Sequence, residues 1–226
     1  MATNEIPPQV KSKKRVADHG EVYTSPREVN AMLDLVKQET ERIESRFLEP
    51  ACGNGNFLAE VLRRKLTVVK SRYAKSQPEF ERYAVLAVSS IYGVDILEDN
   101  VNECRERLFR IFDEKYRVLY KKDCKEECRR SVRFLLKRNI LCGNALTLKD
   151  TDDESIVFAE WSPVNGSMMK RRDFSFSMLL YHSGTNGLPL FAYANDMGED
   201  VFIPEPVREF PPVHFLELEG MEDCHR

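Results

Sequence analysis

Residues 47–58 read Phe-Leu-Glu-Pro-Ala-Cys-Gly-Asn-Gly-Asn-Phe-Leu and constrain the fold more than any other segment. The apolar pair Phe47 and Leu48 predicts a strand, Gly53 and Gly55 predict a tight turn, and the apolar pattern after them predicts a helix. Such a turn lets backbone N–H groups approach a ligand where a side chain would block it. Many strand-to-helix turns contain Gly-x-Gly, so the pair alone is also compatible with a turn that binds nothing.

Short apolar runs alternate with longer amphipathic runs over the first two thirds of the chain. The short runs predict strands at about 46–50, 90–95, 140–146 and 155–161. The amphipathic runs predict helices from Pro26 onward and at about 56–66, 79–88, 98–119 and 123–137. Residues 67–82 are polar and contain Pro78, which predicts a partly helical insertion. Alternating strands and helices predict an α/β sheet with parallel strands and flanking helices.

Composition divides the 226 residues into three parts. Residues 1–17 are polar, basic and Pro-containing, which predicts a flexible N-terminal segment. Residues 18–165 contain the alternating pattern and form the predicted domain. Residues 166–226 are rich in Pro, Gly and aromatic residues, which predicts an irregular C-terminal extension of loops with short strands at 188–193 and 213–218.

The bulk composition is that of a soluble globular protein, with 42% hydrophobic and 31% charged residues. No apolar run approaches the roughly 20 residues that a membrane helix needs, and the N-terminus lacks the apolar core of a secretory signal, so we expect a cytoplasmic protein without a membrane partner. The net charge of −3 permits nucleic-acid binding at local basic runs without requiring it. The six cysteines lack the paired spacing of a zinc site, and we expect no metal.

Residues 49–58 resemble the cofactor-binding motif of S-adenosylmethionine-dependent N6-adenine DNA methyltransferases, the modification subunits of restriction–modification systems. That family typically has Asp/Glu-Pro-Ala-Cys-Gly-x-Gly-x-Phe-Leu at this place. Residues 20–26, Gly-Glu-Val-Tyr-Thr-Ser-Pro, resemble a segment that precedes the turn in the same subclass, often Gly-x-x-Tyr-Thr-Pro. The resemblance covers about residues 15–165. It implies a Rossmann-like sheet, S-adenosylmethionine as cofactor, and DNA as the partner.

The resemblance also assigns cofactor-binding roles. Gly53, Gly55 and the neighbouring Ala51 would lie along the methionine part of the cofactor, and Glu49 would orient its amino group. Asp95 would bind the ribose hydroxyls, and Ile96 would pack against the adenine ring. Tyr23 and Thr24 would lie near the cofactor carboxylate. The family's Gly-Asp-Ala-Leu is Gly-Asn-Ala-Leu here, so Asn144 would accept from the adenine amino group through its amide oxygen.

The predicted catalytic loop departs from the family pattern. The family has Asn/Asp/Ser-Pro-Pro followed by an aromatic residue. The first residue and a backbone carbonyl accept hydrogen bonds from the target amino group, and the aromatic residue stacks on the flipped base. Here Ser162 and Pro163 match the first two positions, Val164 replaces the second proline, and Asn165 replaces the aromatic residue. Stacking on an aromatic side chain is worth about 1–3 kcal/mol per base. Trp161 or Phe174 would then have to replace the missing aromatic residue. Trp161 is also compatible with an ordinary core or sheet-edge position.

Three functions remain open on these residues. The first is transfer of a methyl group from S-adenosylmethionine to adenine N6 in DNA, with Ser162 and Pro163 presenting the base. The second is a non-catalytic cofactor-binding subunit that acts through a restriction or specificity partner. The third is a methyltransferase that acts on RNA or protein. Residues 173–226 become acidic, which favours a partner that supplies DNA recognition.

Overall fold

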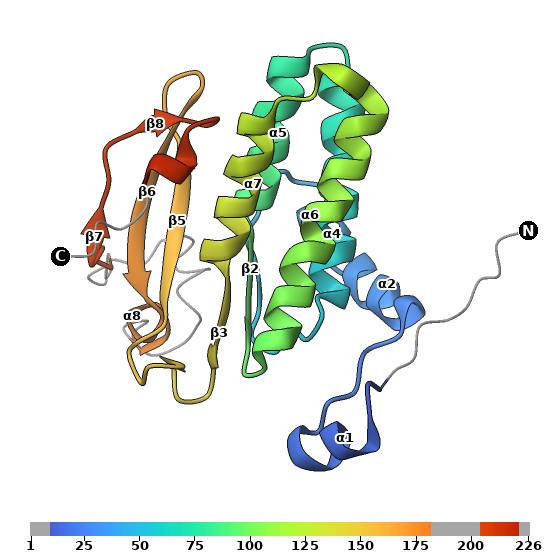
Figure 1. The fold of residues 1–226 in the computed structure, drawn as a ribbon, viewed down its shortest axis with the longest axis vertical. Coiled ribbons are helices and arrows are strands. Elements are labelled where there is room, and N and C mark those ends of the chain that lie inside the picture. Colours follow the sequence, from blue (N-terminus) through green and yellow to red (C-terminus); the bar gives the residue numbers. More distant parts are fainter. Residues whose placement is uncertain (1–9, 182–203, 222–226) are drawn as a thin grey trace, which may run out of the picture.

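The structure is a computed structural model that describes residues 10–181 and 204–221. Its class is mixed α/β, as the alternating sequence pattern predicts. Three parallel strands lie between a layer of long helices and a second, antiparallel sheet (Figure 1). Helices α4 and α6 lie on one side of strands β2 and β3 in this view, and strands β5 and β6 lie on the other.

The α-helices of the described chain differ widely in length. They are α1 (Lys13–His19), α2 (Pro26–Asp34), α3 (Lys37–Thr40), α4 (Asn56–Tyr73), α5 (Gln77–Ser89), α6 (Glu98–Tyr120), α7 (Glu126–Asn139) and α8 (Phe176–Tyr181). Short 3-10 turns occur at Lys121–Asp123 and Leu218–Met221. Among residues 10–181 and 204–221, no helix combines the length and the apolar character needed to cross a membrane.

The strands form two sheets. The first contains β1 (Phe47–Glu49), β2 (Ile91–Asp95), β3 (Ile140–Asn144) and β4 (Lys149–Asp150) in that order, with the first three parallel. The second contains β5 (Val157–Pro163), β6 (Met168–Ser175), β7 (Arg208–Glu209) and β8 (Val213–His214), all antiparallel to β6. Each parallel connection crosses over two long helices, so the carboxyl ends of β1, β2 and β3 meet at one edge.

The alternation of β2 separates two apolar cores. Ile91 joins the core formed with the helices, and Gly93 lies against Leu58 of α4. Tyr92 and Val94 point to the opposite face, where they join a core supplied by β5 and α8. Successive side chains of a strand point to opposite faces, so burial of both faces requires the almost continuously apolar β2 sequence.

Helices occupy more of the predicted polar insertion at 67–82 than its partly helical character suggested. Helix α4 continues to Tyr73, and α5 begins at Gln77 with Pro78 in its first turn. Proline is tolerated there because the first-turn N–H groups have no partner within the helix. Most polar residues of the segment are exposed or partly exposed, Glu81 is fully buried, and Val69 continues the buried stripe of α4.

The predicted boundaries of the N- and C-terminal parts also change. Residues 13–17 of the segment expected to be flexible belong to helix α1, which Ser12 caps. The predicted boundary at residue 165 falls inside the β5–β6 hairpin. Its two strands pair along their length, from Val157 opposite Ser175 to Pro163 opposite Met169. Residues 168–181 are therefore continuous with the fold. Of the short strands predicted in the extension, 213–218 contains β8, and 188–193 lies outside the described residues.

Candidate functional site at the carboxyl edge of the parallel sheet

The Gly turn at 53–55 connects β1 to α4 at the carboxyl edge. Gly53 and Gly55 have φ angles of 51° and 83°, in the region that favours glycine. The Gly55 N–H donates to the Cys52 carbonyl at 2.8 Å, which closes the turn, and Gly55 is also the N-cap of α4. The sequence pattern therefore predicted this element correctly as a strand, a turn and a helix N-terminus.

Both glycines are also required by close packing inside the chain. A Cβ atom at Gly55 would lie 2.5 Å from Sγ of Cys104, which is fully buried on α6. A Cβ atom at Gly53 would lie 3.1 Å from the ring of Tyr23. The turn thus lies directly on α6 on one side and under Tyr23 on the other.

Asp95 ends β2 next to this turn, as the resemblance implies. Its carboxylate accepts from the backbone N–H groups of Gly53 and Leu97, at 2.9 Å each, and from Nδ2 of Asn100 at 3.3 Å. The two backbone donors bind different carboxylate oxygens, so Asp95 holds the turn against the start of α6. Each oxygen keeps further acceptor capacity for hydroxyl groups of a ligand.

Tyr23 and Thr24 reach the same place from the N-terminal part of the chain. The Thr24 carbonyl accepts from Nδ2 of Asn56 at 3.0 Å, which attaches it to the first residue of α4. The Tyr23 hydroxyl lies 3.1 Å from both Glu21 Oε1 and Asn100 Oδ1. Burial and the hydrogen bond with Glu21 raise the pKa of Tyr23 to about 12. Two motifs 30 residues apart are therefore in contact.

Glu49 and Ala51 lie at the end of β1, at the start of the turn. Burial raises the pKa of Glu49, and the backbone N–H of Ala51 partly offsets this by donating to the carboxylate. In the part of the chain that the structure describes, no cation pairs with Glu49. A buried carboxylate without a cation is disfavoured unless something charged or hydrogen-bonding approaches it. Glu49 is thus suited to a cationic group on a ligand.

Ile96 and Asn144 occupy the same edge with different consequences. Ile96 is 52% exposed just beyond β2, where its side chain can cover an apolar ring. Asn144 ends β3, but its Oδ1 already accepts from the backbone N–H groups of Leu146 at 2.8 Å and Thr147 at 3.3 Å. The oxygen expected to accept from adenine is therefore held in a local turn.

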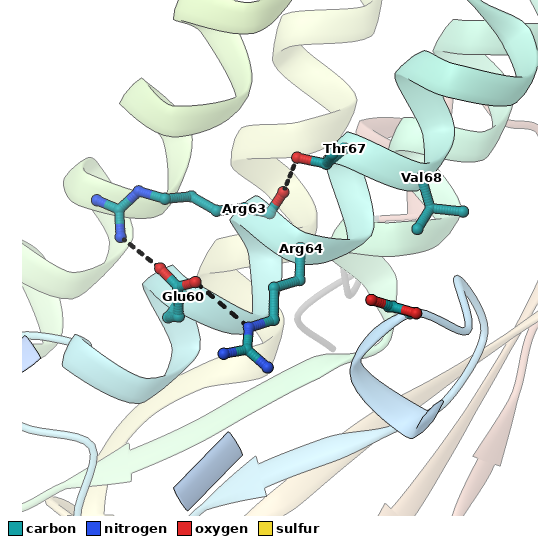
Figure 2. Close-up of a pocket in the computed structure, with 6 residues that line it drawn as sticks. Glu60, Arg63, Arg64, Thr67 and Val68 are labelled. Atoms are coloured by element: carbon teal, nitrogen blue, oxygen red, sulfur yellow. Dashed lines mark hydrogen bonds and ion pairs between the residues drawn. The ribbon is translucent and has the colours of Figure 1, made fainter. Parts of the chain in front are cut away.

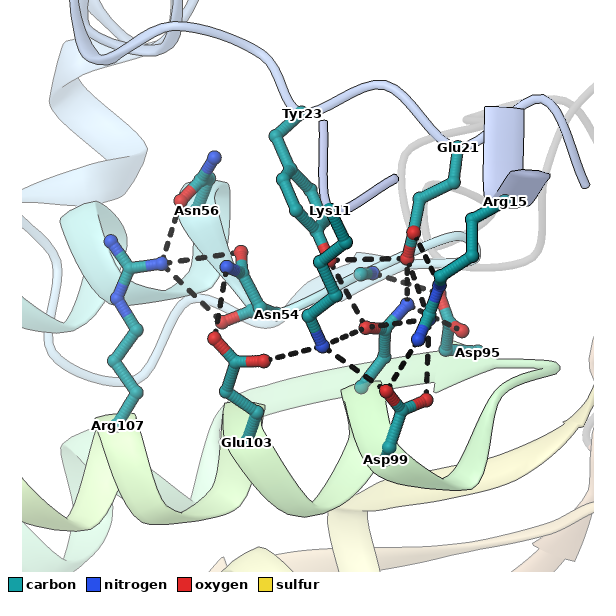
Figure 3. Close-up of polar contacts among 12 residues, drawn as sticks. Lys11, Arg15, Glu21, Tyr23, Asn54, Asn56, Asp95, Asp99, Glu103 and Arg107 are labelled. Atoms are coloured by element: carbon teal, nitrogen blue, oxygen red, sulfur yellow. Dashed lines mark hydrogen bonds and ion pairs between the residues drawn. The ribbon is translucent and has the colours of Figure 1, made fainter. Parts of the chain in front are cut away.

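A polar cluster beside Asp95 was not predicted from the sequence (Figure 3). Asp99 and Glu103 project from α6 toward Lys11 and Arg15 of the N-terminal part. The available signal was the four-residue spacing of Asp99 and Glu103, which places two carboxylates along one side of a helix that begins just after Asp95. The hydrogen bond from Arg15 lowers the pKa of Asp99 to about 2, with Lys11 contributing.

Trp161, predicted either as a base-contacting or as a core residue, is a core residue. It is 3% exposed, and its ring meets Phe134 edge to face at 6.0 Å. Its Nε1 donates to Oδ1 of Asn139 at 3.0 Å. Asn139 ends α7 directly before β3, so Trp161 lies at the amino end of the parallel sheet.

Ser162 and Pro163 are not brought to the Gly turn. Strand β5 begins beside the carboxyl end of β3, where Ile156 lies against Gly143, and it runs toward Asn139 at the opposite end. Ser162 and Pro163 follow Trp161 and pair with Lys170 and Met169 in the hairpin. The predicted catalytic loop is thus at the amino end, because β5 joins an antiparallel sheet instead of the parallel one.

A shallow pocket of about 200 Å³ lies farther along α4 (Figure 2). It is lined by Glu41, Glu60, Arg63, Arg64, Thr67 and Val68. Its arginines are already paired, since Arg64 contacts Asp34 at 2.8 Å and Glu60 at 3.3 Å, and Arg63 contacts Glu60 at 3.5 Å. The carboxyl edge therefore remains the better candidate.

Within residues 10–181 and 204–221, no group of three or more His, Cys, Asp or Glu side chains is arranged to hold a metal ion. Comparisons of the chain with family models, with curated proteins and with solved structures returned no match. The interpretation of the edge consequently depends on the residues themselves and on the resemblance of residues 20–26 and 49–58.

Proposed function

We propose that the chain binds S-adenosylmethionine at the carboxyl edge of its parallel sheet, as a cofactor-binding subunit related to N6-adenine DNA methyltransferases. One observation carries this proposal. The Gly53 N–H contacts the Asp95 carboxylate at 2.9 Å, so the turn and the acidic strand end lie side by side. Nucleotide-type ligands bind at the carboxyl ends of parallel strands in open α/β sheets. The order β1-β2-β3 also agrees with one half of the Rossmann-like sheet that the resemblance implies.

The residues at this edge match the chemical groups of the cofactor. Asp95 offers carboxylate acceptors for the two ribose hydroxyls, and Ile96 offers an apolar surface for adenine. Glu49 offers a half-buried carboxylate for the amino group. When bound, the cofactor would supply a methyl group on a positively charged sulfur, and an acidic edge favours that charge over an anionic ligand.

Methyl transfer by this chain alone has weaker support. The Ser162–Pro163 segment lies at the amino end of the sheet, whereas the proposed cofactor edge is at the carboxyl end. This separation favours a subunit that binds the cofactor and acts with a restriction or specificity partner on DNA. A self-contained enzyme, whether for DNA, RNA or protein, would need its target-binding groups from another segment.

Calorimetric titration tests the cofactor proposal. We expect S-adenosylhomocysteine and S-adenosylmethionine to bind the wild-type chain, and Asp95→Ala to weaken both by about tenfold or more, the loss expected for hydrogen bonds to a charged group. Glu114→Ala, which removes an exposed carboxylate elsewhere on α6, is the matched control and should bind normally. Equal binding by Asp95→Ala and wild type would disprove the placement of the cofactor.

Methylation is tested separately by expression in a host that lacks adenine methylation, followed by mapping of 6-methyladenine. We expect an unmodified genome from the chain alone. Methylated adenines in a defined context, lost with Ser162→Ala, would instead establish a self-contained enzyme.

A further inference from the structure

Residues 11–24 lie across the carboxyl edge, and we refer to them as the N-terminal latch. The latch comprises helix α1 and the extended chain up to Thr24. Figure 1 shows α1 beyond the body of the fold, while Figure 3 shows Lys11, Arg15, Glu21 and Tyr23 directed toward α6 and the Gly turn. The segment therefore covers the place where the proposed cofactor would bind.

Ion pairs attach the latch to α6. Lys11 Nζ lies 2.6 Å from Glu103 and 3.2 Å from Asp99, and Arg15 also pairs with Asp99. Inside the latch, Arg15 Nε lies 2.6 Å from Glu21. Two cations thus bridge to α6 carboxylates about 85 residues away in sequence, which is a tertiary attachment.

The far end of the latch lies on the Gly turn itself. The Tyr23 ring is so close to Gly53 that a Cβ atom there would lie 3.1 Å away. The Tyr23 hydroxyl and Glu21 both meet Asn100, whose amide also binds Asp95. A ligand that approaches Gly53 from the side of Tyr23 would have to displace this ring, so the latch position affects access to the turn.

The ion pairs between the latch and α6 are open to solvent on the α6 side. Val22 is 60% exposed, and Asp99, the carboxylate shared by both cations, has a side chain that is 56% exposed. Ion pairs that solvent reaches contribute little to stability and weaken as salt rises. Glu21 and the half-buried Tyr23 are more protected, so the pairs of Lys11 and Arg15 with α6 are the salt-sensitive part of the attachment.

From these contacts we propose that the latch opens to admit the cofactor and closes over it, and that Lys11 and Arg15 set the balance between the two positions. The proposal rests on the proposed function, because it assigns regulation to the same edge. It predicts that weakening the ion pairs speeds both entry and release of the cofactor, since the same barrier is crossed in each direction. The closed latch would retain the ligand once bound.

Hydrogen exchange measured without any ligand tests the latch itself. We expect Lys11→Glu/Arg15→Glu to speed amide exchange of residues 11–24 and 51–56 by about 3–10-fold, the effect of losing the three ion pairs with α6. The matched control is Lys13→Glu/Lys14→Glu, which makes the same change of charge on exposed residues of the same latch. In the wild type, 0.5 M salt should also speed amide exchange of these residues, as Lys11→Glu/Arg15→Glu does. Equal exchange in the two double variants would disprove the latch.

Release of bound S-adenosylhomocysteine, followed by stopped-flow displacement, tests control of access. We expect release to be about 3–10-fold faster from Lys11→Glu/Arg15→Glu than from the Lys13/Lys14 control, the same factor as for latch opening. An unchanged release rate from a variant whose latch exchanges faster would disprove the gating role. Absence of binding to the wild type would instead overturn the proposed function, while the exchange measurement still decides whether the latch opens. Circular dichroism confirms that the variants are folded.

Discussion

The backbone N–H of Gly53 donates a 2.9 Å hydrogen bond to Oδ2 of Asp95, which joins the β1 turn to the end of β2. The other carboxylate oxygen accepts from the Leu97 N–H at the same distance. Asp95 therefore has a structural role at the edge in addition to its proposed role in ligand binding. Substitutions at this position must be interpreted with both roles in mind.

The structural role predicts a loss of stability in Asp95→Asn. Asparagine keeps one carbonyl oxygen, so one of the two backbone donors loses its acceptor. We expect the free energy of unfolding to fall by about 1–2 kcal/mol, near the lower part of the range for an unsatisfied donor because water reaches this edge. Urea denaturation followed by circular dichroism measures this. A variant as stable as wild type would show that the hydrogen bond lost with the second oxygen contributes nothing to stability.

Gly55→Ala is predicted to be more damaging. The φ angle of 83° strains any L-residue by about 1–2 kcal/mol, and contact with buried Cys104 adds an overpacking cost of about 1–3 kcal/mol. The double variant Gly55→Ala/Cys104→Ala should recover part of this loss, because it removes the sulfur but not the backbone strain. A double-mutant cycle by urea denaturation gives the coupling, and strict additivity would contradict the packing argument.

Trp161 is predicted to act on stability and not on base binding. Trp161→Phe leaves Oδ1 of Asn139 without its indole donor and should lower the free energy of unfolding by about 1–3 kcal/mol. Trp161→Ala should cost about 3–5 kcal/mol, because it empties a large buried volume. Thermal denaturation by circular dichroism measures both. If Trp161→Phe unfolded like wild type but lost DNA binding, the base-contacting interpretation would be restored.

The burial of Lys65 leads us to predict that the stability of the fold rises with pH. It is fully buried on α4, and its ammonium donates to the Ile43 carbonyl at 3.0 Å and to Ser90 Oγ at 2.6 Å. Burial lowers its pKa from 10.5 to about 7. Between these two values the unfolded chain binds a proton that the folded chain does not, so the free energy of unfolding should increase with pH by up to roughly 1.4 kcal/mol per unit. Below about pH 7 this contribution is constant.

The control for this pH dependence is Lys65→Met, which removes the titrating group. Its urea stability should be lower overall, since the Ile43 carbonyl and the Ser90 hydroxyl lose a partner. The difference between the wild-type and variant curves isolates Lys65 from cysteines and tyrosines that titrate in the same range. Parallel curves between pH 7 and 10 would contradict the lowered pKa.

The local pattern of apolar, polar and glycine residues was enough to predict the parallel part of the fold. The apolar run of β2, the Gly turn at 53–55 and the amphipathic pattern of α6 each determine one element from neighbouring residues. The resemblance, and not the local pattern, implied that Asp95 and Tyr23 lie near the turn, and the structure brings both against Gly53.

The strand with which residues 157–163 pair could not be predicted from local pattern. The apolar run at 155–161 predicts a strand, but nothing within it states whether it joins the parallel sheet or forms a hairpin with Met168–Ser175. The partner strand lies in a segment rich in Pro, Gly and aromatic residues, where its alternation of buried and exposed side chains was not recognised. The position of Ser162 and Pro163 depended on this single choice. The ion pairs of Lys11 and Arg15 were missed for a related reason, since they join distant segments.

The direction of β5 sets a rule for redesign of this chain. A catalytic loop grafted at positions 162–165 would be delivered to the end of the sheet that carries Asn139, however well its sequence was chosen. The connection that follows β3, residues 145–155, starts at the same edge as Asp95 and Gly53. An engineer who wished to add chemistry to this scaffold would have to build it into that connection, and could leave the β5–β6 hairpin untouched.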